Sequence, residues 1–161
     1  MKSYKDDIDQ LAQFSNEIRK LTLKRLKEVP DGFINWRLNN TAMSFSHLIQ
    51  HIINVDEIFF SLTTTTNKNY LWITGSEEPH KNIDDAIYAS MLKKLKNYGV
   101  KRDTIISSFN DTSINELVFD QNGESMSIWW FLMHRVLEHE TYHRGQLAAY
   151  LKVLKGESSE I

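Results

Sequence analysis

Apolar residues recur at helical spacing along most of the chain, and the first such segment runs from about Ser3 to Val29. The apolar residues of this segment would share one face of a helix, with Lys and Glu on the opposite face. The apolar positions are Ile8, Leu11, Phe14, Ile18, Leu21 and Leu26. The run Pro30-Asp31-Gly32 ends the helix, because proline disfavours the helical conformation before it and glycine permits a turn.

A second helix is predicted from an N-cap at Ser44 to about Leu62. Its apolar positions are Phe45, Leu48, Ile49, Ile52, Val55 and Phe59. The polar residues that follow, and the segment from Tyr70 to His80 with its Pro79, predict a long crossover loop before the next helix.

A third helix is predicted to start after Asn82, although Gly99 weakens the pattern in its middle. Its apolar positions are Ile83, Ile87, Met91, Leu95, Ile105 and Phe109. Residues 110–125 are rich in turn formers, with a short extended piece at 117–119. A last helix runs from about Met126 to Leu154 and stops at Gly156.

Four helices with one longer crossover, between the second and the third, predict an all-α four-helix bundle. The length of 161 residues fits a single domain over residues 1–161. The chain has 19 Lys and Arg residues and 21 Asp and Glu residues, so it lacks the excess of positive charge that is typical of nucleic-acid-binding proteins. The chain has no cysteine and no apolar stretch of membrane-spanning length, so we expect a cytoplasmic protein with no membrane partner.

The most informative segment lies in the last helix, at His139-Glu140-Thr141-Tyr142-His143. Histidines four positions apart lie on one face of a helix at chelating distance. That face also carries apolar residues, and burying two imidazoles costs free energy unless their nitrogens are satisfied. A divalent metal would satisfy both, whereas histidines at a solvated end of the bundle would need none.

A further histidine on the second helix strengthens the metal hypothesis. His51 lies beside Leu48, Ile52 and Val55 and points inward, while His47 one turn earlier is the alternative ligand. Three imidazoles suit a divalent transition metal, zinc or nickel first, and leave an open position for water or substrate.

The pattern His-Glu-x-x-His also occurs in zinc metalloproteases, where the glutamate is the general base. The longer metzincin pattern needs a glycine and a histidine where this chain has Gln146 and Ala149. Too little chain follows for a glutamate-bearing helix of the other protease type. We therefore expect Glu140 to support the site or face solvent.

The motif Trp36…Ser44-x6-His51…Asp56, with His-Glu-x-x-His-Arg-Gly-Gln-Leu-x-x-Tyr-Leu near the C-terminus, resembles the DinB/YfiT-like superfamily. These are bacterial four-helix-bundle metalloproteins, and the resemblance covers essentially the whole chain. It implies His51, His139 and His143 as metal ligands, since the serine spacing selects His51 over His47.

The resemblance also implies a function, because characterised relatives are thiol-dependent enzymes. The first hypothesis is therefore a metal-dependent S-transferase that joins a low-molecular-weight thiol to a small electrophile. The alternatives are a metal-dependent hydrolase that uses metal-bound water, with Glu140 or Asp56 as a candidate base, and a non-catalytic, stress-related binding protein. Candidate pocket residues are Gln50, Asp56, Glu140, Arg144 and Gln146.

A homodimer is the expected assembly, because superfamily members often pair through bundle helices. The run Trp129-Trp130-Phe131 supports this expectation. Three bulky residues in a row cover most of a helix circumference, so one should face the core while another meets a loop or a second subunit.

Overall fold

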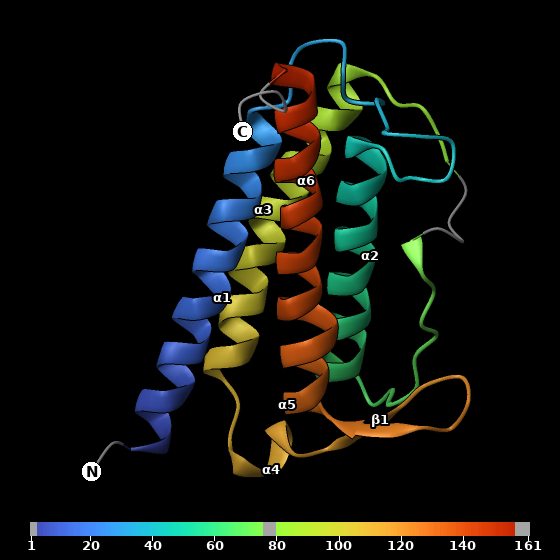
Figure 1. Cartoon of the computed structure of the whole chain (residues 1–161). Helices are drawn as coiled ribbons and strands as arrows, with labels where there is room; N and C mark the ends of the chain where they lie inside the picture. Colours follow the sequence, from blue (N-terminus) through green and yellow to red (C-terminus); the bar gives the residue numbers. More distant parts are fainter. Residues whose placement is uncertain (1–2, 76–79, 157–161) are drawn as a thin grey trace.

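The computed structural model describes residues 3–75 and 80–156, and its main feature is a bundle of four long helical segments (Figure 1). The first three are α1 (Tyr4–Lys27), α2 (Phe45–Thr64) and α3 (Asp85–Ser107). The fourth is continuous from α5 (Ile128–Trp130) through η2 (Phe131–Glu138) to α6 (His139–Lys155). The predicted all-α four-helix bundle is confirmed.

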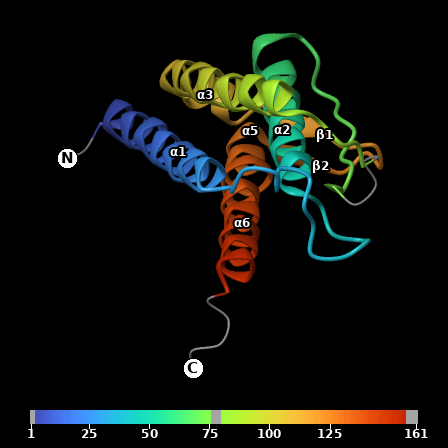
Figure 2. The ribbon, with the colours of Figure 1, turned by 90° about the horizontal axis from the view of Figure 1, so that it is seen from above.

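The long connection after α2 determines the topology of the bundle. It runs back along the outside of α2, so that α2 and α3 point the same way while α1 and α6 run opposite to them (Figures 1 and 2). Seen from above, α1 and α3 lie side by side and α6 packs across both α1 and α2. This is the predicted crossover, although residues 76–79, which include Pro79, lie outside the described residues.

Local sequence signals determine where the helices begin. Ser3 and Asp6 form a reciprocal capping box at α1. Ser44 accepts a hydrogen bond from the backbone N–H of His47 (3.1 Å), which makes it the N-cap predicted from the sequence. Gly156 ends α6 in the left-handed conformation, with φ of 71°.

Gly99 does not interrupt α3, and its missing side chain has a structural reason. A Cβ built at this position would lie 2.9 Å from Cγ of Arg19. The glycine therefore lets α1 and α3 approach closely enough for the Arg19 side chain to pass between them.

The buried face of α1 differs from the predicted apolar stripe. Phe14 and Leu21 are 51% and 43% exposed. At 100° per residue they lie roughly 120–140° around the helix from Ile8, which is buried. Polar residues occupy the buried face instead: Ser15, Arg19 and Thr22. The apolar stripe predicted for α1 is therefore wrong in part. A pattern of apolar residues cannot identify a buried helix face that is made of polar side chains.

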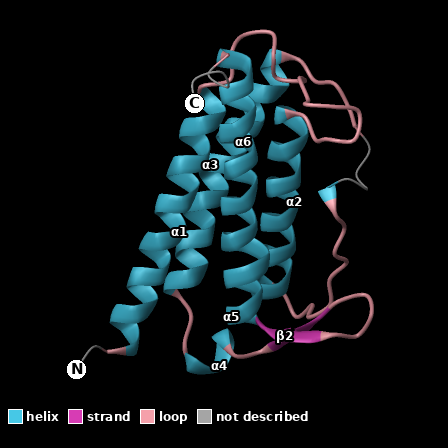
Figure 3. Cartoon of the chain, in the orientation of Figure 1, coloured by secondary structure: helices cyan, strands magenta, loops and turns pink. Residues whose placement is uncertain are grey.

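The segment between α3 and the last helix holds a small β-hairpin (Figure 3). A one-turn helix, α4 (Asp111–Ile114), precedes β1 (Leu117–Phe119), which pairs antiparallel with β2 (Ser125–Ser127). The predicted helix start at Met126 is wrong, because this residue pairs with Val118 in the hairpin. The helix begins at Ile128 instead, with Ser127 as its N-cap.

The segment η2, expected to be α-helical, is a π-helix of 8 residues that leads directly into His139. Phe131 is buried as one of the three bulky residues was expected to be, whereas Trp129 and Trp130 are exposed. π-Helical turns are rare and occur frequently at functional sites.

None of the helices in residues 3–75 and 80–156 is long and apolar enough to cross a membrane.

Candidate metal centre

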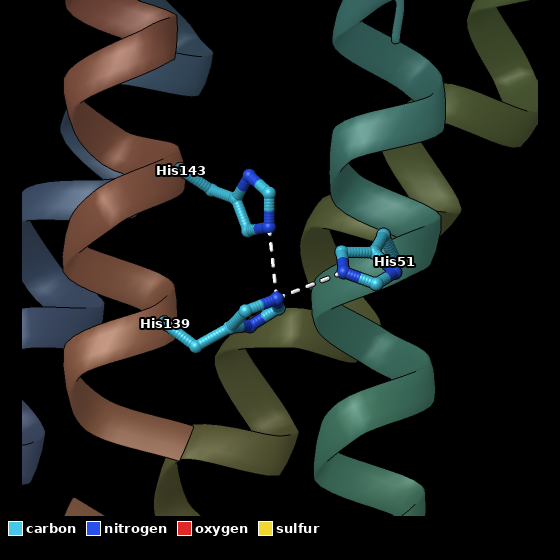
Figure 4. Close-up of side chains that lie close together, drawn as sticks. All are labelled: His51, His139 and His143. Atoms are coloured by element: carbon cyan, nitrogen blue, oxygen red, sulfur yellow. Dashed lines mark hydrogen bonds between the residues drawn. The ribbon is translucent and has the colours of Figure 1, made fainter. Parts of the chain in front are cut away.

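Three histidine side chains converge between α2 and α6, and we call them the histidine triad (Figure 4). His51 comes from α2, while His139 and His143 are one turn apart on α6. Nε2 of His139 lies 2.9 Å from Nε2 of His51 and 2.9 Å from Nε2 of His143. The structure thus brings together the ligand set that the family resemblance implied.

The contacts within the triad fit a metal better than they fit hydrogen bonds. One ring nitrogen carries either a proton or a lone pair, so Nε2 of His139 cannot make two good hydrogen bonds to the other two rings. Two ligands of a tetrahedral zinc ion at about 2.0–2.1 Å lie about 3.3 Å apart. The two 2.9 Å spacings to His139 need to open by a few tenths of an ångström, and all three donor nitrogens lie within 4.8 Å of one another.

The electrostatics of the triad keep its central ring neutral. Burial lowers the pKa of His139 to about 3, and the neighbouring His143 and His51 add to the effect. A neutral imidazole has a lone pair for a metal, which is the protonation state that metal binding requires.

Gln146 fixes the orientation of one ligand. Its Oε1 lies 2.6 Å from Nδ1 of His143, the ring nitrogen that faces away from the triad. The amide oxygen accepts a hydrogen bond from Nδ1–H, so the lone pair of His143 is on Nε2, directed at the other two histidines. Gln146, one of the candidate pocket residues, lines the pocket beside the triad.

A pocket of about 450 Å³ opens on the triad. The loop before α2, the crossover loop, η2 and α6 all contribute to its wall. The lining residues besides the triad are Thr41, Ala42, Met43, Trp72, Thr74, Gly75, Arg135, Tyr142, Gln146 and Tyr150. The indole of Trp72 packs against His139, with ring centroids 5.3 Å apart. A metal bound by the triad would be reached through this pocket.

The structure places Asp56 and Glu140 away from the pocket. Together with Arg19 and Arg102 they form a buried group that we call the charge cluster, with one residue from each of α1, α2, α3 and α6. Arg19 contacts Asp56 at 2.7 Å and Glu140 at 2.8 Å. Arg102 contacts Asp56 at 3.2 Å and Glu140 at 2.7 Å.

Glu140 is 1% exposed, so the expectation that it could face solvent is wrong. Burial raises the pKa of this carboxyl group, but Arg19 and Arg102 outweigh that effect and hold the pKa well below its usual range. A carboxylate engaged by two arginines is a weak proton acceptor, and its ion-pair partners are Arg19 and Arg102, so the geometry argues against Glu140 as the catalytic base.

His47 and Gln50 lie on another side of α2. They line a separate hollow, and the ring of His47 faces that of His80 at 5.9 Å. Arg144 is not among the residues that line the triad pocket. Sequence reasoning missed Trp72, Arg135 and Tyr142. Arg135 lies four positions before His139 and Tyr142 directly precedes His143, so their places in the sequence could have indicated them. Only tertiary packing brings Trp72 to the site.

Comparisons with known proteins agree with this architecture. The DinB family profile matches residues 1–158. Among solved structures, the chain is similar to YfiT from Bacillus subtilis, which is described as a probable metal-dependent hydrolase with an unusual four-helix bundle topology. The TM-score is 0.73 at 14% sequence identity, and the match covers 97% of this chain and 91% of YfiT. The DinB-like protein YjoA from Bacillus subtilis gives 0.66 at 17% identity, covering 91% and 92%. No curated protein sequence matches significantly.

Proposed function

This chain belongs to the DinB family, and on that premise we propose that it is a metal-dependent hydrolase whose ion is held by the histidine triad. The observation that carries the proposal is the convergence of three imidazoles on one open pocket. The description of YfiT as a probable metal-dependent hydrolase supports it. Zinc or nickel is the ion we propose, because imidazole donors suit both.

His51, His139 and His143 would hold the ion, and a divalent ion bound there would supply Lewis acidity for hydrolysis at a carbonyl or phosphoryl group. The chain's own residues prepare the site for it. Gln146 sets the orientation of His143, and the indole of Trp72 packs against one side of the His139 ring. The phenol of Tyr142 and the amide of Gln146 reach the pocket and can donate hydrogen bonds to a substrate.

Thiol transfer is the second candidate, and one observation favours it. Among the described residues that line the pocket there is no Asp or Glu to accept a proton from water. A thiol ionises more easily than water does and needs no such base at a cationic site. The substrate would then be a small electrophile and the co-substrate a low-molecular-weight thiol.

One experiment separates these functions. Protein purified without an affinity tag is analysed for zinc and nickel and assayed with 4-nitrophenyl acetate in the absence of thiol. Hydrolysis that requires metal, is lost in His139→Ala and persists in His134→Ala supports the hydrolase. His134 is the matched control because it is exposed and pairs with Glu138 outside the triad.

The thiol arm uses cobalt-substituted protein and N-acetylcysteine. A sulfur-to-cobalt charge-transfer band that is absent in His139→Ala, together with no thiol-independent hydrolysis, would replace the hydrolase with the transferase. Failure of the purified protein to bind any divalent ion would overturn both enzymes and favour a non-catalytic binding protein.

A further inference from the structure

Arg135 is the one residue with a permanent charge among the described residues that line the triad pocket. It lies on η2, four positions before His139. In a helix, residues four apart lie on the same face, one turn from each other. The Arg135 side chain therefore shares its wall of the pocket with the first α6 ligand.

The guanidinium of Arg135 is held in a defined orientation. Its central carbon lies 4.6 Å from the centroid of the Trp72 ring, in cation–π contact. Trp72 packs in turn on His139. The phenol of Tyr70 also interacts with this guanidinium and takes up part of its donor capacity. Stacking covers only the flat face of a guanidinium, so its remaining in-plane N–H donors keep the geometry that binds a carboxylate or a phosphate through two hydrogen bonds.

The charge of Arg135 has no acidic counterpart in the part of the chain that the structure describes. Arg19 and Arg102 are paired with carboxylates at 3.2 Å or less, whereas no described Asp or Glu lies within ion-pair distance of Arg135. A half-buried cation beside a site for a divalent ion gives the pocket a positive potential. Such a pocket attracts anions and disfavours cations.

We propose that Arg135 binds an anionic group of the substrate, and that the substrate class is small molecules with a carboxylate or phosphate group beside the reacting bond. The proposal rests on the proposed function, since it concerns the same pocket. Arg135 is then a specificity-determining residue. It fixes the anionic end of the substrate one helical turn from the triad, which holds the reacting bond near the metal position.

The test measures binding by isothermal titration calorimetry with two probes, benzoate and its uncharged counterpart benzamide. Wild-type protein, Arg135→Gln and Arg25→Gln are each titrated with and without bound zinc. Arg25→Gln is the matched control, because it removes the same charge from an exposed pair with Glu28 on α1. Zinc content and melting temperature show whether each variant keeps the triad and the fold.

We expect wild-type protein and Arg25→Gln to bind benzoate about tenfold or more tightly than Arg135→Gln does, in both metal states. Benzamide should bind weakly to all three proteins. Inorganic phosphate as a competitor shows whether a phosphate group occupies the same position.

Three results would overturn the proposal: equal benzoate affinity in Arg135→Gln and wild type, equal affinity of wild type for benzamide and benzoate, or no benzoate binding by wild type in either state. The zinc-free titrations keep this test separate from the proposed function. A protein that takes up no divalent ion would refute the hydrolase, yet the comparison of benzoate affinity between wild type and Arg135→Gln would still test the role of Arg135.

Discussion

Oε1 of Gln146 lies 2.6 Å from Nδ1 of His143, on the side of the ring opposite to the histidine triad. This hydrogen bond sets both the tautomer and the orientation of a ligand. Removing such a partner lowers metal affinity about 10–100-fold. We therefore expect Gln146→Leu to bind zinc about 10–100-fold more weakly than wild type, as measured by competition with a chromogenic chelator.

The matched control for Gln146→Leu is Gln50→Leu. Gln50 is exposed on α2 and donates to Asn54, outside the triad. Its loss should leave zinc affinity unchanged. Equal zinc affinity in the two variants would show that the orientation of His143 does not depend on Gln146.

The second prediction concerns the choice between two histidines of α2. His51 contacts His139, whereas His47 faces His80 across a separate hollow. We expect His51→Ala to lose the bound ion and His47→Ala to keep it at one equivalent per chain, measured by elemental analysis. Full metal content in His51→Ala would contradict the ligand assignment.

The third prediction is a pH dependence of the metal-free protein. The pKa of His139 is lowered to about 3 in the fold, against about 6.5 in the unfolded chain. Between these values the unfolded state binds more protons, so stability is present above about pH 6.5 and is lost as the pH falls toward 3. The slope should approach about 1.4 kcal/mol per pH unit.

Urea unfolding of the metal-free protein at a series of pH values measures this slope. His139→Gln should flatten it, because the titrating group is gone. His134→Gln, at an exposed histidine, should not. A profile that is identical in wild type and His139→Gln would assign the acid sensitivity to other groups.

The fourth prediction concerns the charge cluster. Arg102 is fully buried, and Arg102→Met leaves Asp56 and Glu140 with one arginine between them. Breaking a buried ion pair costs about 3–5 kcal/mol of unfolding free energy. Lys94→Met removes an exposed contact with Glu57 and should cost less than about 1 kcal/mol. Urea denaturation measures the free energy of unfolding of both variants. Equal decreases in Arg102→Met and Lys94→Met would contradict the prediction.

The fifth prediction is the homodimer. Trp129 and Trp130 are 41% and 48% exposed and stack at 5.3 Å beside Phe14, which is 51% exposed, around a hollow of about 390 Å³. We predict that this apolar surface pairs two chains. Light scattering should give twice 18.9 kDa for wild type, and the monomer mass for the double variant Trp129→Ser and Trp130→Ser.

The control for the dimer prediction is Ile87→Ser, an equally exposed apolar residue on α3 (46%). It should remain dimeric. A wild-type protein of monomer mass at high micromolar concentration would contradict the prediction.

Periodicity was sufficient to predict the four helices, because each has an apolar stripe and a recognisable N-cap such as Ser44. It failed at Met126, where the extended backbone depends on pairing with Val118 rather than on local preference. Periodicity also failed at η2. A π-helix arises from tertiary packing and leaves no pattern of apolar residues by which the sequence could distinguish it from an α-helix.

For the site, the spacing of His139 and His143 identified a chelating pair, because an α-helix converts a separation of four residues into proximity. For the third ligand, the apolar pattern of α2 allows both His47 and His51, and only the family resemblance distinguishes them. The partners of Glu140 were not predictable. They come from α1 and α3, and only the packing of the whole bundle brings them together.

The charge cluster also bears on how the chain folds. Each of α1, α2, α3 and α6 contributes one charged side chain to it, so a partly folded bundle that lacks any one of them buries a charge with part of its compensation missing. Intermediates with two or three docked helices are therefore penalised relative to both the unfolded chain and the complete bundle. Folding of this protein should thus be cooperative across helices far apart in the sequence, with the cluster acting as a check on complete assembly.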